Sequence, residues 1–226
     1  AINLRYEDYF NDTDHNPVKN RNDTVSSDPF VIEEDAISKF LQDGYRSSAE
    51  LLYELTTELR LRWLSTYQYG LTEDISDGDR TTTAPPRPPN TNVGRLGYAR
   101  TTINTLAHEL NLISSSDGPL TWIAGAFYLD ESIPLMLLRY NLSTVLANTA
   151  PTSTIVTLAD NSTRSIFGQL SYSFAPSWEL LAGARYSQDQ QDYNRIASPG
   201  GTGIGVQKSN QTTGRLALNW KLKDDL

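Results

Sequence analysis

The sequence predicts an all-β protein, an antiparallel up-and-down transmembrane β-barrel with about eight strands. Three observations predict this fold class. Apolar and polar residues alternate with a period of two in eight segments of about 10 residues. The connections between these segments alternate between short and long. Tyr, Trp and Phe stand near the segment ends, with Leu and Ala between them. In a membrane barrel the apolar side chains face lipid and the polar ones line the interior.

Composition and charge exclude several classes of protein. The 226 residues contain 19 Lys and Arg against 27 Asp and Glu, a net charge of −8, so we expect no nucleic-acid partner. The chain has no Cys, which excludes disulfide scaffolds, Cys-ligated metals and thiol catalysis. No apolar run approaches the roughly 18 residues that a membrane-spanning helix needs. The use of 12 Tyr, 4 Trp and 6 Phe within a hydrophobic content of 38% favours sheet over bundled helices.

The first three predicted strands are residues 1–10, 45–55 and 59–69. In each of them one parity is apolar and the other polar, as expected of a two-faced strand. The apolar parity consists of Ile2, Leu4, Tyr6 and Phe10, then Tyr45, Ala49, Leu51, Tyr53 and Leu55, then Leu59, Leu61, Trp63, Tyr67 and Tyr69.

The remaining predicted strands are residues 105–112, 120–130, 165–174, 178–186 and 215–222. Four of them alternate cleanly, whereas residues 120–130 carry apolar side chains on both parities, so the pattern does not orient that strand. The apolar parity consists of Leu106, Leu110 and Leu112, then Ile166, Leu170, Tyr172 and Phe174, then Trp178, Leu180, Ala182, Ala184 and Tyr186, then Leu216, Leu218, Trp220 and Leu222.

The connections predict which strand ends lie on the same side of a membrane. Residues 56–58, 114–119 and 175–177 are short and composed of turn-forming residues. The predicted long loops are residues 11–44, 70–101, 131–163 and 188–211, which are rich in Asn, Asp, Thr, Ser, Gly and Pro. This arrangement is typical of barrels with short periplasmic turns and long extracellular loops.

The turn at 56–58 also predicts a register. A three-residue loop keeps both apolar faces on one side and pairs Leu55 with Leu59, Tyr53 with Leu61 and Leu51 with Trp63. The same register sets Glu54 opposite Arg60 on the polar face. By the same argument, the loop at 175–177 pairs Phe174 with Trp178, Tyr172 with Leu180 and Leu170 with Ala182, which places an aromatic pair beside a short turn.

Two hairpin motifs carry a resemblance to a known family. The segments TLAHELNLIS at 105–114 and DGPLTWIAGAFY at 117–128 form the first motif. The segments SIFGQLSYSF at 165–174 and WELLAGARY at 178–186 form the second. Both resemble barrel hairpins of TonB-dependent outer-membrane receptors of Gram-negative bacteria. The resemblance implies that residues 1–226 are an internal part of one larger barrel domain, without the plug domain and the C-terminal strands.

The resemblance also implies a function. Such receptors lie in the bacterial outer membrane, among its lipids, and import a scarce extracellular ligand, most often a ferric siderophore and otherwise a vitamin or glycan. TonB would act only through the plug domain, and no cofactor is implied. If these strands contact ligand, we expect aromatic and charged residues at the loop ends to do so: Tyr69, Arg95, Tyr98, Arg139, Tyr140, Tyr193 and Arg195.

Two other readings remain open at the level of sequence. Eight strands suffice to close a small outer-membrane barrel with an adhesive or structural role, in which the first and last strands would pair. A soluble, secreted, carbohydrate-binding β-sandwich would use the apolar parity as its core. The sequence predicts no catalytic and no metal-binding residues. His15 fits a solvated loop, and His108, on the apolar parity between Leu106 and Leu110, fits a packed or interfacial residue.

Overall fold

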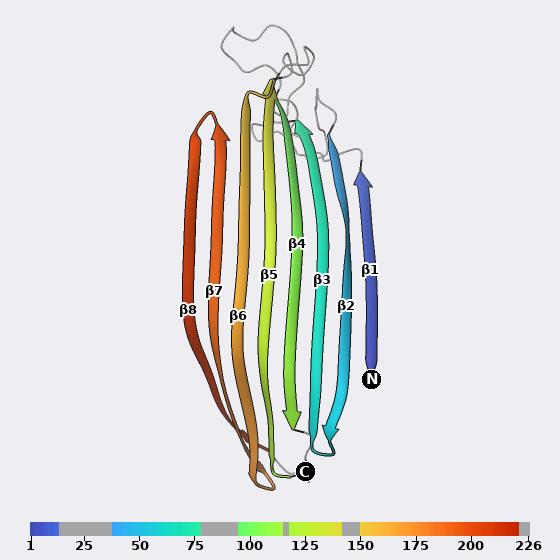
Figure 1. Cartoon of the computed structure of the whole chain (residues 1–226), viewed down its shortest axis with the longest axis vertical. Helices are drawn as coiled ribbons and strands as arrows, with labels where there is room; N and C mark the ends of the chain where they lie inside the picture. The colour runs from blue at the N-terminus through green and yellow to red at the C-terminus, as the bar shows by residue number, and fades with distance from the viewer. Residues whose placement is uncertain (14–37, 78–94, 115–117, 142–149, 222–226) are drawn as a thin grey trace, which may run out of the picture.

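The computed structural model describes residues 1–13, 38–77, 95–114, 118–141 and 150–221. These residues form one sheet of eight strands, in which each strand lies beside its neighbours in sequence and runs antiparallel to them (Figure 1). The strands are β1 (Ile2–Thr13), β2 (Lys39–Thr56), β3 (Leu59–Asp77), β4 (Arg95–Ser114), β5 (Leu120–Asn141), β6 (Ser153–Ala175), β7 (Trp178–Ser198) and β8 (Gly201–Trp220). The predicted up-and-down, all-β architecture is confirmed. The described residues contain no helix long and apolar enough to cross a membrane.

The strands extend much farther than the alternating segments predicted. Strands β2 to β8 are 18 to 23 residues long. Residues 1–10 cover most of β1, and each other predicted segment is the part of its strand next to the lower end of the sheet in Figure 1, where the turns 57–58 and 176–177 lie. The upper halves carry polar side chains on both faces in several strands, so they lack the alternation that marks a strand in the sequence.

The predicted long loops therefore include many residues that belong to strands. The loop 188–211 is wrong, because β7 continues to Ser198 and β8 begins at Gly201. Gly200 and Gly201 have φ values of 136° and 82°, which side chains rarely tolerate, so two glycines allow the chain to reverse there. The other three predicted loops begin and end inside strands, since residues 11–13, 39–44, 70–77, 95–101, 131–141 and 153–163 belong to β1 to β6.

The lower turns follow the predicted register with one correction. Tyr53 pairs with Leu61, Leu51 with Trp63 and Glu54 with Arg60, as predicted. Leu55 does not pair with Leu59, because a bulge after Glu54 brings Thr56 opposite Leu59 and leaves a two-residue turn. The bulge absorbs the extra residue, so the apolar faces still coincide.

The turn between β6 and β7 repeats this arrangement. Tyr172 pairs with Leu180 and Leu170 with Ala182, as predicted, but Ala175 rather than Phe174 lies opposite Trp178. The rings of Phe174 and Trp178 nevertheless stack, with centroids 6.5 Å apart. The predicted aromatic pair beside the short turn is thus present.

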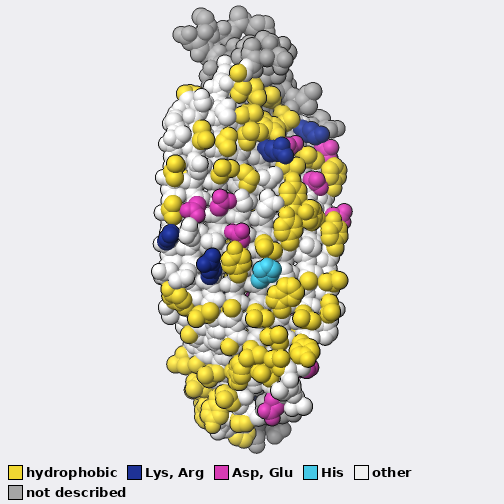
Figure 2. Space-filling view, viewed as in Figure 1, with side chains coloured by type: hydrophobic (Ala, Val, Ile, Leu, Met, Phe, Trp, Pro, Cys, Tyr) yellow, Lys and Arg dark blue, Asp and Glu magenta, His cyan; other side chains and the backbone are white. Residues whose placement is uncertain are grey.

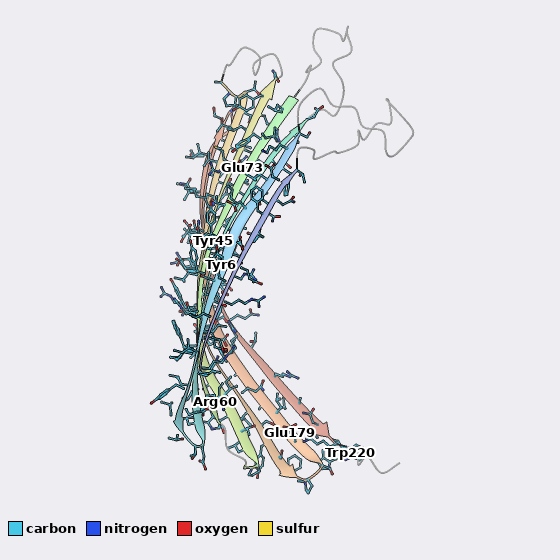
Figure 3. All side chains as sticks on the ribbon, turned by 90° about the vertical axis from the view of Figure 1, so that its right-hand side faces the viewer. Tyr6, Tyr45, Arg60, Glu73, Glu179 and Trp220 are labelled. Atoms are coloured by element: carbon cyan, nitrogen blue, oxygen red, sulfur yellow. The ribbon has the colours of Figure 1, made fainter. Side chains whose placement is uncertain are left out.

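The sheet is a single bent layer with side chains on both sides (Figure 3). Among the described residues, Ala197 is the one buried apolar residue, whereas many large apolar side chains are exposed, Leu4 at 79% and Leu216 at 76%. A β-sandwich would cover one face of each sheet with the other. The β-sandwich reading is therefore wrong for these strands.

The two edge strands do not meet. Within the described residues β1 is hydrogen-bonded to β2 alone and β8 to β7 alone. A closed eight-stranded barrel needs its first and last strands to pair. That reading is also contradicted, and the sheet is an open section of wall.

Candidate functional site

The two faces of the sheet differ in chemistry, and the register assigns every strand residue to one of them. We call the face that carries Leu4, Leu51 and Trp63 the outward face, and the opposite face the inward face. Apolar residues continue along the outward face through Leu110, Ala126, Ile166, Leu170, Ala182, Leu216 and Leu218. Apolar side chains dominate the lower part of this face, and most of the acidic and basic ones lie in its upper half (Figure 2).

Aromatic residues border the apolar part of the outward face. Near the lower end, Trp178 and Trp220 stack with ring centroids 5.6 Å apart. At mid-height the ring centroid of Tyr45 lies 6.2 Å from that of Tyr6 and 5.7 Å from that of Tyr69 (Figure 3). Two aromatic belts around an apolar band are typical of membrane barrels, where Tyr and Trp lie at the lipid–water boundaries.

The upper belt is inclined relative to the hydrogen-bond ladder. The rung through Tyr69 continues through Asn104, Ser132 and Asp160 to Asp192 on β7. The outward tyrosine of β7 is Tyr186, six residues below Asp192. A belt that stays at one membrane depth but crosses successive rungs of the hydrogen-bond ladder requires strands that are tilted relative to the membrane normal. Barrel closure requires the same tilt.

His108 lies within the outward aromatic residues, as its parity predicted. Its ring stacks between Trp63 and Tyr128, at centroid distances of 6.1 and 6.5 Å. The guanidinium carbon of Arg164 lies 5.9 Å from the Tyr128 ring centroid, on the neighbouring strand. His108 is thus a packed residue, and His15 lies outside the described residues.

The inward face carries a charged network that joins four strands. Arg62 Nε donates to Glu50 Oε1 at 2.6 Å, and Asn3 Nδ2 donates to Glu50 Oε2 at 2.9 Å. Arg62 Nη1 also lies 3.7 Å from Glu109 Oε1, which accepts a hydrogen bond of 2.6 Å from Asn111. The sequence predicted only the pair nearest the turn, Arg60 with Glu54, whose Nε and Oε1 are 2.6 Å apart.

A second inward cluster surrounds Arg185 on β7. Its guanidinium carbon lies 5.5 Å from the ring centroid of Phe127 and 5.7 Å from that of Phe167, which places the cation against two aromatic rings. The guanidinium also donates to Ser187 Oγ at 3.0 Å and to Ser165 Oγ at 2.8 Å. Phe127 belongs to the strand whose parity was ambiguous, so the sequence did not indicate this cluster.

The predicted ligand-contacting residues divide between the two faces. Arg139, Tyr193 and Arg195 belong to the inward face, near the upper ends of β5 and β7. The register places Arg95 on the same face, opposite Asn141, although its side chain is outside the description. Among the described residues, neither Arg139 nor Arg195 forms an ion pair.

Tyr69, Tyr98 and Tyr140 belong to the outward face instead. The Tyr98 hydroxyl donates to Glu73 Oε1 at 2.9 Å. Burial, together with this hydrogen bond to a carboxylate, raises the pKa of Tyr98 above its ordinary value. The structure therefore does not bring these three tyrosines together with the inward arginines.

The described residues contain no group of three or more His, Asp or Glu side chains arranged to hold a metal ion. What the inward face offers is a polar wall with cations near its upper end. Such a surface can hold an anionic ligand by charge-assisted hydrogen bonds.

Comparison with known families fits this geometry. The family profile described as "TonB dependent receptor-like, beta-barrel" matches residues 1–226. The chain belongs to this family. Receptor barrels of this kind have one lipid-facing and one lumen-facing wall. The family is one of receptors rather than enzymes.

A solved receptor barrel has the same fold. The ferric yersiniabactin uptake receptor FyuA from Yersinia pestis superposes on 84% of this receptor barrel with a TM-score of 0.64 and 13% sequence identity. The match covers 27% of the FyuA chain, so this chain spans about a quarter of that receptor's length. A search of curated proteins finds no match.

Proposed function

We propose that these strands are part of the wall of a bacterial outer-membrane receptor that imports an anionic metal chelate, with ferric siderophores as the ligand class. The outward face would meet membrane lipid, and the inward face would line the ligand's path. Import would depend on TonB, which would act through a plug domain rather than through these strands. The family membership and the two chemically distinct faces support this proposal.

The arginines near the upper end of the inward face are the reason for proposing an anionic ligand. Arg139 and Arg195 are separated by two strand positions and four residues of β6, which places their Cα atoms about 16 Å apart. Two side chains as long as arginine can contact one chelate across that span. Tyr193, two residues from Arg195 on the same face and 39% exposed, offers a ring beside the cations.

The test is ligand binding to the full-length receptor. A ferric tris-catecholate serves as the anionic probe and a neutral ferric tris-hydroxamate as the uncharged one. We expect the R139Q/R195Q variant to bind the anionic probe at least about 10-fold more weakly, since each charged hydrogen bond contributes roughly 1.5–3 kcal/mol. Binding of the neutral probe should change little.

Arg215→Gln is the matched control. Arg215 is also inward and exposed, but it lies opposite Gly183 in the lower part of the sheet. If R139Q/R195Q and R215Q weaken the anionic probe equally, or if neither changes its affinity, the upper arginines are not the ligand site.

A further inference from the structure

A groove of about 330 Å³ lies across β6, β7 and β8. Two adjacent rungs of the outward face form it, Arg164–Gln188–Asn210 and Ser162–Gln190–Lys208. Arg164 and Lys208 stand at opposite corners, with their Cα atoms about 12 Å apart from the strand and residue spacings. Both side chains are long enough to reach the space between them, which the amide groups of the glutamines and Asn210 also border.

Two cations, Arg164 and Lys208, line the groove. Among the described residues, neither Arg164 nor Lys208 forms an ion pair. Asp189 also lines the groove, but its carboxylate accepts a hydrogen bond of 2.8 Å from Thr163, and both residues have inward parity. Two cations with neutral amide donors suit a phosphate, which accepts several charge-assisted hydrogen bonds at once.

Acidic residues border the groove on its upper side and on the side of β5. Asp160 and Asp192 face each other on the next rung up, and Asp130 lies opposite Ser162. Asp192 Oδ2 accepts a hydrogen bond of 2.7 Å from Gln190. Asp160 and Asp192 repel an anion that approaches from above, and Asp130 repels one that approaches from the side of β5, so the favourable approach is from the apolar side below.

The outward surface below the groove suits a hydrocarbon chain. The next rung holds Ile166, 65% exposed, and Tyr186, 39% exposed. The following rung, Gly168–Ala184–Gly214, has almost no side chains and forms a shallow trough, which Leu170 and Leu216 continue downward. An anionic head in the groove would thus have its apolar tail on an apolar strip at membrane depth.

We propose that this groove binds the phosphate of a membrane lipid, with an acyl chain lying in the trough over Gly168, Ala184 and Gly214. The lipid belongs to the leaflet at the upper aromatic belt, away from the short turns. The inference uses the outward face as a lipid-facing wall but is independent of which ligand the receptor imports. A free phosphate shares the head-group chemistry but would not use the trough.

The test measures lipid binding to the full-length receptor in maltoside detergent. The probes are dioctanoyl phosphatidic acid, dioctanoyl phosphatidylcholine and inorganic phosphate, and native mass spectrometry counts bound molecules. We expect R164Q/K208Q to bind phosphatidic acid at least about 10-fold more weakly than the unchanged receptor, because two charged contacts are lost. Ala184→Trp, which fills the trough, should weaken the lipid without removing the cations.

K39Q/R100Q is the matched control. It removes one Lys and one Arg from the same outward face, where they contact Asp12 and Glu73 at 3.3 and 3.5 Å, and should leave lipid binding unchanged. Arg164→Lys keeps the charge and should retain most of the affinity, which distinguishes loss of binding from loss of folding. Equal lipid affinity in R164Q/K208Q and K39Q/R100Q would overturn the site. Full competition by inorganic phosphate, with no effect of A184W, would overturn the lipid as its occupant.

Discussion

Replacing Ala182 with arginine should lower the free energy of unfolding of the receptor in a bilayer by about 2–4 kcal/mol, the cost of a cation on the lipid face near the bilayer midplane. Ala182 lies on the outward face of β7, on one rung with Leu170 and Leu216. It is four residues above Trp178 and four below Tyr186, between the two aromatic belts. Because each 1.4 kcal/mol is a factor of ten, the ratio of folded to unfolded receptor would fall by one to three orders of magnitude.

Ala217→Arg is the matched control, because it makes the same change at almost the same height on the other face. Ala217 follows Leu216 on β8 and lies opposite Leu181 on the inward face. On the polar, lumen side its guanidinium keeps polar partners, so we expect a change below about 1 kcal/mol. Equilibrium unfolding of the full-length receptor from lipid vesicles measures both. Equal losses in A182R and A217R would show that the outward face does not meet lipid.

The alternation that A182R tests is also what made the lower half of the sheet predictable. The sequence parity predicts one face for Leu51, Tyr53, Leu61 and Trp63. These residues pair across the turn as the period of two requires. Above the aromatic belt the constraint disappears. The run from Gln188 to Asp192 is polar on both parities because both faces are solvated, and it has the composition of a loop although it belongs to β7.

The candidate site was predictable only in part, for related reasons. Tyr69 shares the parity of Trp63, and Tyr98 shares that of Leu106, so parity alone could have assigned both to the outward face. Arg139 could not be assigned to a face, because β5 has apolar residues on both parities. Its assignment required the pairing of β5 with β4 and β6. The contact of Arg62 with Glu109 joins β3 and β4, which a long connection separates in the sequence. Local residue spacing therefore does not determine this contact.

Close packing between the first three strands involves a tyrosine over two glycines. Tyr9 on β1 lies opposite Gly44 on β2, and Gly44 lies opposite Gly70 on β3. The Tyr9 hydroxyl occupies the space where a side chain would begin at either glycine, and both glycines are buried. Glycines that weaken strands are here covered by an aromatic ring from the neighbouring strand. The inward surface at this point therefore depends on the absence of two Cβ atoms.

Gly44→Ala should accordingly destabilise the receptor by about 1–3 kcal/mol, as overpacking does in a close-packed site. The new Cβ would lie 2.5 Å from the backbone oxygen of Tyr69 and would also collide with the Tyr9 ring. Gly203→Ala is the control, because a Cβ there has no atom within 4 Å, and it should leave stability unchanged or raise it by up to about 1 kcal/mol. Unfolding of G44A, G203A and G44A/Y9A in vesicles separates the causes. If G44A/Y9A recovers part of the stability lost in G44A, that part is due to the Tyr9 ring and the remainder to the backbone oxygen of Tyr69. Equal stability of G44A and G203A would mean that Tyr9 does not cover Gly44.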